Sequence, residues 1–443
     1  MRPLLLRLFG IHAHEVRPVV LGFSLFFLTF ACFFLLRPVR ETMGIVGGVN
    51  QLQWLFTGTF LLTLAVLPLY GWLASRVARR RILAWTFGFF VSNLLGFALL
   101  LSLAPDSVWA ARSFYMWMSM ANMLAISVAW SVCADLFVLG QAKRLFALLA
   151  AGASLGGLTG PLLAVVLVGP LGHAGLLLLS AGLLAGAMVA AAALKRWRDA
   201  QPASAGAEHD NHRPLGGNPF AGALDVLRSP YLLGIAVYVL LLASVTTFLY
   251  FEQARLVELS YPDRADQTRV FGILDAIVQS LAILTQLFLT GRIALRFGIG
   301  VLLTGVPLAI VFGFLWLATA PVFLVLAVVM VLRRAGEYAL IRPGREMLFT
   351  SMRASDKYKS KNFIDTVVYR FGDVVSAWFK TLVDALAQQP ALAALVGAGV
   401  SLAWAGSGWW LARRQPLVDP PGTTLPAAGG VHSAAAPVAR GTS

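Results

Sequence analysis

The sequence is poor in charged residues and nearly free of cysteine. Charged residues make up 12% of the 443 positions, whereas a soluble domain carries about 25%. Because 58% of the residues are hydrophobic, the chain has too little polar surface to face water, and we expect lipid around it. The two cysteines, Cys32 and Cys133, lie inside apolar runs, which argues against a disulfide framework.

Residue sets that would support catalysis are also missing. The sequence has no phosphate-binding Gly-x-x-x-x-Gly-Lys string, so no built-in ATPase is predicted. The charged residues inside the apolar runs include no histidine and no nucleophile–base set, so we do not expect an enzyme. His209 and His212 lie in a hydrophilic, flexible segment and lack a closed ligand set, so neither a metal nor another cofactor is predicted.

Continuous apolar runs of about twenty residues, the length of a membrane-spanning helix, recur along the chain. Lipid offers the backbone no hydrogen-bond partner, so these runs should be helices. We therefore predict an all-α membrane protein of about twelve transmembrane helices in two six-helix halves. The predicted helices are 17–40, 52–73, 82–104, 110–138, 145–168, 174–194, 230–254, 268–290, 300–319, 321–341, 363–386 and 391–411.

A hydrophilic linker, 195–229, divides the chain into an N-terminal half, 1–194, and a C-terminal half, 230–414. The linker cannot bury enough apolar surface to fold alone. The tail, 415–443, is rich in proline, alanine and glycine, so we expect it to be disordered and cytoplasmic.

Basic residues gather in the even-numbered connections between the predicted helices. The second connection alone contains Arg76, Arg79, Arg80 and Arg81 with no acidic residue. By the positive-inside rule, these connections and both termini are cytoplasmic. The formal charge of +15 then reflects orientation in a bilayer, and no nucleic-acid partner is expected. We expect a multi-pass protein of the bacterial inner membrane.

Charged side chains inside the predicted helices are costly in lipid and should face the protein interior or water. They could form static ion pairs and interfacial anchors, or they could line a polar pathway for a solute. In a pathway, a carboxylate could titrate and couple protons to transport, or the ion pairs could exchange partners. These candidate residues are Arg37, Arg40, Glu41, Asp135, Glu252, Arg255, Asp275, Arg333, Glu337, Arg345, Asp365, Arg370 and Asp373.

Two short patterns suggest how the halves are built. Gly71 to Ala78 and Gly291 to Gly298 share Gly, Ala and Arg in the same register, after helices two and eight. Internal repeats of this kind are typical of secondary transporters, whose binding sites lie between the repeats. In helix five, Gly152, Gly156 and Gly160 recur every four positions, which favours close packing of helices.

The string from Gly71 through Arg76 to Arg81 resembles the second–third helix motif of the major facilitator superfamily, although Ser75 replaces its usual acid. The twelve-helix plan with a central linker is similar over nearly the whole chain. The resemblance implies a transporter whose halves rock about a central site. It also implies a conformational gating role for a set of connection residues. They are Gly71, Arg76, Arg79, Arg80, Gly291 and Arg296.

Within that superfamily, the chain most resembles the ATP/ADP translocase-like nucleotide antiporters. The strings 37–41 and 343–347, followed by 359–368, carry this likeness. It places Arg40 and Arg345 on basic positions of the group and Asp135 on an acidic one. The group usually has Gly-Lys where this chain has Gly372-Asp373, which weakens the expectation of a polyphosphate substrate.

The leading hypothesis is a secondary transporter that moves a small anionic or amphiphilic solute by alternating access, as a monomer. Nucleotide exchange is one alternative. A non-transporting membrane receptor or scaffold, in which the charged residues serve only packing, is another.

Overall fold

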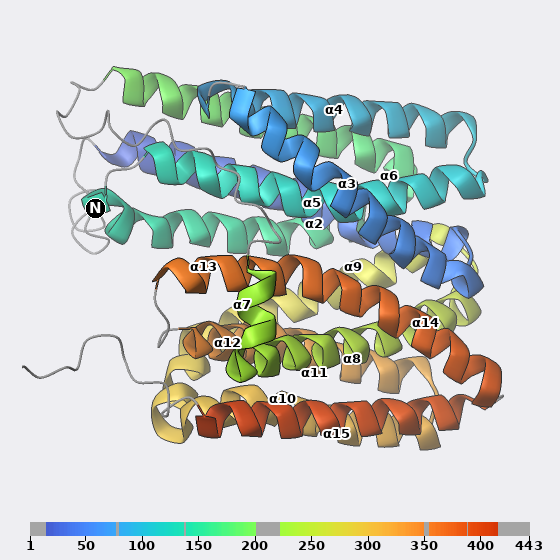
Figure 1. Ribbon diagram of the computed structural model, residues 1–443. Helices are drawn as coiled ribbons and strands as arrows, with labels where there is room; N and C mark the ends of the chain where they lie inside the picture. Colours follow the sequence, from blue (N-terminus) through green and yellow to red (C-terminus); the bar gives the residue numbers. More distant parts are fainter. Residues whose placement is uncertain are drawn as a thin grey trace, which may run out of the picture.

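A computed structural model describes residues 15–76, 79–136, 139–200, 222–349, 354–387 and 389–414. Within these ranges the chain is helical, with no strand. Figure 1 shows two groups of helices lying side by side, α2 to α6 in one and α8 to α15 in the other. The all-α prediction with two halves is therefore confirmed.

In the described part of the N-terminal half, five helices make six spans. Gly172, at φ 63° and ψ −178°, breaks the longest of them into two. A residue with a Cβ rarely adopts this backbone conformation, so glycine is suited to the break. The helices are α2 (Val16–Val46), α3 (Leu52–Arg76), α4 (Arg79–Leu103), α5 (Val108–Leu136) and α6 (Leu139–Asp199).

The C-terminal half is less regular. Gly298, at φ 72°, ends the eighth span, and three π-helical segments interrupt the helices. The elements are α7 (Ala223–Arg228), α8 (Pro230–Ser260), α9 (Arg264–Thr285), η3 (Gln286–Thr290), α10 (Gly291–Thr319), α11 (Phe323–Gly336), η4 (Glu337–Ile341), α12 (Arg342–Leu348), α13 (Ala354–Phe363), η5 (Ile364–Val368), α14 (Tyr369–Ala387) and α15 (Pro390–Arg414).

The outer surface of the described helices suits lipid. Large apolar side chains such as Trp85, Phe312 and Leu324 are 64%, 71% and 73% exposed. Six described helices are long and apolar enough to cross a membrane, and two of them, of 55 and 56 residues, contain the breaks at Gly172 and Gly298. A protein in water rarely exposes so much apolar surface.

Three hydrophobic clusters organise the interior. One lies almost wholly within α2 to α6, and a second lies within the C-terminal half. The third joins the halves, with Leu52 and Tyr115 on one side and Phe251 and Phe271 on the other. We call the end of the molecule that holds this joint, with the 104–107 and 261–263 connections, the loop end. The opposite end, where α2 begins and α15 ends, is the linker end (Figure 1).

Several predicted boundaries differ from the structure. Helix seven was predicted to end at 254 and helix eight to start at 268, but α8 continues to Ser260 and α9 starts at Arg264. The charged residues there lie on helix ends, and Asp263 caps α9 by accepting hydrogen bonds from the amides of Ala265 and Asp266. The predicted linker is helical at 195–199 and in α7, and its residues 201–221 lie outside the described ranges, as does the tail 415–443.

Candidate functional site

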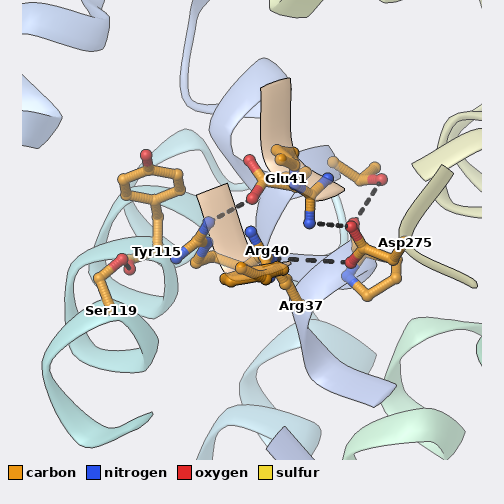
Figure 2. Close-up of polar contacts among 10 residues, drawn as sticks. Arg37, Arg40, Glu41, Tyr115, Ser119 and Asp275 are labelled. Atoms are coloured by element: carbon orange, nitrogen blue, oxygen red, sulfur yellow. Dashed lines mark hydrogen bonds and ion pairs between the residues drawn. The ribbon is translucent and has the colours of Figure 1, made fainter. Parts of the chain in front are cut away.

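A cavity of about 290 Å³ lies between the two halves. Helices α2, α3 and α5 contribute one wall, and α8, α9, α11 and α14 contribute most of the other. Figure 2 shows Arg37, Arg40 and Glu41 from α2 facing Tyr115 and Ser119 on one side and Asp275 on the other. We call this space the central cavity.

Guanidinium groups dominate the wall of the central cavity. Among the residues that the structure describes, five arginines and three carboxylates line it: Arg37, Arg40, Arg333, Arg334 and Arg370 against Glu41, Asp275 and Asp373. Glu337 adds one more carboxylate from behind the wall, 2.9 Å from Arg333. Counted with Glu337, the group keeps one unmatched positive charge.

Three of the ion pairs are local to one helix. Arg40 pairs with the adjacent Glu41 in α2. Arg333 pairs with Glu337 four residues on, and Arg370 lies 3.4 Å from Asp373, three residues on. Residues three or four apart share a helix face, so the Arg333–Glu337 and Arg370–Asp373 pairs follow from the sequence of each segment, whereas Arg40 and Glu41 are adjacent in the chain.

Asp275 is paired differently, because its partners come from both halves. Its side chain is 3% exposed and forms an ion pair with Arg334 of α11. Its Oδ2 atom lies 3.7 Å from Nε of Arg37 in α2 and has no hydrogen-bond partner among the described residues. Arg37 also donates to the Tyr338 hydroxyl across the same boundary, at 3.1 Å. Asp275 therefore lies between guanidinium groups of opposite halves.

Aromatic and neutral polar side chains complete the central cavity, and the sequence reasoning did not select them. A buried tyrosine hydroxyl usually needs a polar partner, so tyrosines within apolar helices were the signal available. Tyr338 lies in the π segment η4, and Tyr369 directly follows η5; π segments are frequent at functional sites. The residues missed include Phe56, Thr59, Tyr115, Ser119, Asn122, Tyr250, Tyr338 and Tyr369.

Two predicted residues, Glu252 and Arg255, lie outside the central cavity. They line a second space of about 400 Å³ at the loop end, with Lys380 and Asp384. We call it the loop-end cavity. Arg255 donates to Glu252, and Lys380 donates to Asp384, so each ion pair lies within one helix. Phe56 packs on Tyr250 and Phe251 between the two cavities, at ring-centroid distances of 5.5 and 5.7 Å.

Other predicted residues lie elsewhere. Arg345 and Asp365 pair at 3.0 Å but do not line the central cavity. The side chain of Asp135 lies outside the described residues. Seven of the thirteen predicted residues thus surround the central cavity: Arg37, Arg40, Glu41, Asp275, Arg333, Arg370 and Asp373.

The predicted gating residues are only partly described. Arg76 is exposed at the end of α3, whereas the side chains of Arg79 and Arg80 and the surroundings of Gly71 lie outside the described part. Gly291 opens α10, and exposed Arg296 lies over the ring of Phe297 at 5.5 Å.

The halves are held together at the loop end. Arg264 of α9 pairs with Asp106 at 2.9 Å and donates to the carbonyl of Pro105. The Thr268 hydroxyl hydrogen-bonds with Thr42 at 2.7 Å and with His173 at 2.9 Å. The structure is therefore a state in which the loop end is closed.

The described residues contain no group of three histidine, cysteine or acidic side chains that could hold a metal ion. Long apolar helices in two halves, with a charged cavity between the halves, define a polytopic membrane protein of the transporter type. A family model described as Major Facilitator Superfamily matches residues 19–343, and the chain belongs to this superfamily.

Solved structures share the fold. The POT family transporter PepTSo aligns over 91% of this chain and 99% of its own, with TM-score 0.64 and 12% identity. The nucleoside transporter NupG aligns over 90% and 99%, with TM-score 0.59 and 12% identity.

ADP,ATP carrier protein 1 of Chlamydia pneumoniae is 26% identical over an alignment of 174 residues that covers 34% of this chain. The match spans about a third, 33%, of that relative's length.

Proposed function

We propose that the protein is a secondary transporter of the bacterial inner membrane that carries a small anionic solute through the central cavity. The observation that carries the proposal is the excess of guanidinium groups over carboxylates, five against three, among the described residues of the cavity wall. Buried arginines bind carboxylate and phosphate groups well because their planar N–H donors match the geometry of these anions. A bound anion would offset the unmatched positive charge.

The size of the cavity limits the solute. Small-molecule sites generally measure about 300–1,000 Å³, and the central cavity, at about 290 Å³, lies near the lower limit. Tyr115, Tyr250 and Tyr369 add aromatic surface beside the arginines. These features favour a compact anion that also carries some apolar or planar surface.

Alternating access fits the placement of the contacts between the halves. The loop-end contacts of Arg264 and Thr268 would break when that end opens, while the ion pairs within single helices would persist. The described basic residues Arg413 and Arg414 lie at the linker end, which we assign to the cytoplasm by the positive-inside rule. One chain contains the complete cavity, so we propose a monomer as the working unit.

Nucleotide exchange is a second candidate, because the sequence of a named ADP,ATP carrier matches part of the chain. Asp373 counts against a polyphosphate, since it adds negative charge to the cavity wall and occupies Arg370. Protons remain a candidate coupling ion through the carboxylates of the wall.

Flux measurements with purified protein in liposomes test the proposal. The panel would contain orthophosphate, dicarboxylates, AMP, ADP and ATP, each with and without an imposed pH gradient. We expect saturable uptake of at least one anion, and uncharged analogues of similar size should not compete. The absence of flux for every anion would contradict the proposal.

A further inference from the structure

Asp275 is the wall carboxylate with ion-pair partners in both halves. Arg37 belongs to α2 of the N-terminal half, and Arg334 belongs to α11 of the C-terminal half. The other two carboxylates of the wall, Glu41 and Asp373, pair with arginines of their own helix. Movement of one half against the other therefore acts on the Asp275 contacts more than on the local pairs.

The position of Asp275 links it to closure of the loop end. On α9, Thr268 lies two turns before Asp275. Its hydroxyl contacts that of Thr42, which lies little more than one turn after Arg37 on α2. Separation of α2 and α9 at the loop end would also separate Arg37 from Asp275. Without a carboxylate between them, closure would bring Arg37 and Arg334 together as like charges in a buried site.

Asp275 does not use its full bonding capacity. Within the part of the chain that the structure describes, neither its Oδ2 atom nor Nε of Arg334 has a hydrogen-bond partner. A carboxylate in water-poor surroundings normally accepts several hydrogen bonds. An anion that offers the two guanidinium groups more hydrogen bonds than Asp275 does could therefore displace it from them.

We propose that Asp275 is an internal counter-anion that lets the empty transporter close its loop end, and that the transported anion competes with it for Arg37 and Arg334. The competition by a transported anion rests on the proposed function. The role of Asp275 in closing the loop end does not. This role predicts that the wild-type protein can return empty and so perform net transport. A protein without this carboxylate would need a bound anion to close and would perform exchange only.

Distances between spin labels test the closure directly. Leu103 at the end of α4 and Leu386 near the end of α14 are exposed at the loop end, one in each half. Labels would be attached at Leu103→Cys and Leu386→Cys in a chain with Cys32→Ser and Cys133→Ser, and their distance distribution measured by double electron–electron resonance.

For Asp275→Asn without added anions, we expect the ratio of closed to open molecules to fall at least about tenfold. Inorganic phosphate or sulfate should restore closure, because either oxyanion can bridge the two guanidinium groups. An unchanged distribution in Asp275→Asn would overturn the inference. Opening without recovery in either oxyanion would overturn the competition.

Two further variants keep the test decisive. Asp365→Asn removes a carboxylate whose partner, Arg345, lies in the same half and outside the central cavity, so closure should not change. The double variant Arg37→Gln with Asp275→Asn removes one charge of each sign, should close without phosphate, and serves if Asp275→Asn cannot be purified. An open distribution in the double variant would contradict the role of Asp275. If closure changes in the variants as expected but no anion is transported, the proposed function would be rejected and the role of Asp275 in closure would stand.

Discussion

The central cavity and the loop-end cavity lie at the same boundary between the halves, yet their charges are arranged differently. In the loop-end cavity two basic and two acidic side chains form two pairs, each within α8 or α14. In the central cavity the arginines are in excess, and Asp275 is shared between the halves. Balanced pairs within a helix can persist through movement of the halves. Shared and unmatched charges respond both to movement and to a ligand.

The comparison predicts that two matched arginine variants differ strongly in anion uptake. This difference is the largest effect that we expect. Arg40→Ala removes a guanidinium group from the central cavity, and we expect anion uptake into liposomes to fall at least about thirtyfold. Arg255→Ala removes one from the loop-end cavity, and uptake should stay within a few-fold of wild type. Equal losses in both variants would remove the distinction between the cavities.

The comparison assumes that each half moves as a rigid unit. Close packing of α2 on α6 would keep the N-terminal half rigid, and its contribution to stability can be tested. A Cβ at Gly160 would lie 2.7 Å from the carbonyl oxygen of Ala31 and from the amide nitrogen of Leu35, whereas a Cβ at Gly182 meets no atom within 4 Å. Gly160→Ala should therefore lower stability by about 1–3 kcal/mol. Thermal unfolding in detergent would measure it, with Gly182→Ala as a control that keeps wild-type stability.

The smallest effect is expected at the loop-end contact between Arg264 and Asp106. The Asp106 side chain is 86% exposed, so this ion pair is well solvated. Exposed pairs contribute about 0.2–1 kcal/mol, so Arg264→Ala should lower the closed population by less than about fivefold. The spin-label distances at Leu103 and Leu386 measure this change. A collapse of closure in this variant would mean that the loop end, and not Asp275, controls the state.

The fold could be predicted largely from the sequence, because length and apolar character are local properties of each span. Helix ends were less predictable where charged residues, such as those from Glu252 to Arg269, extend helices beyond the apolar run. Gly172 and Gly298 depart from helical geometry inside long helices, and their positive φ angles could not be derived from composition.

The candidate site was harder to predict. Spans that are apolar on all sides do not reveal which face points inward, so Glu252 and Arg40 looked equivalent in the sequence, yet they line different cavities. The sharing of Asp275 between Arg37 and Arg334 depends on how α2, α9 and α11 pack together. Tyr338 and Tyr369 were missed because tyrosine is also common in ordinary helix packing.

A cryo-electron microscopy structure with the best-transported anion of the panel would test the central claim most directly. We predict density for the anion in the central cavity, within hydrogen-bond distance of Arg40 and of either Arg37 or Arg334, with Asp275 displaced from at least one of its partners. Density only beside Arg255 and Lys380 in the loop-end cavity, or an anion bound away from the arginines of the central cavity, would contradict the account.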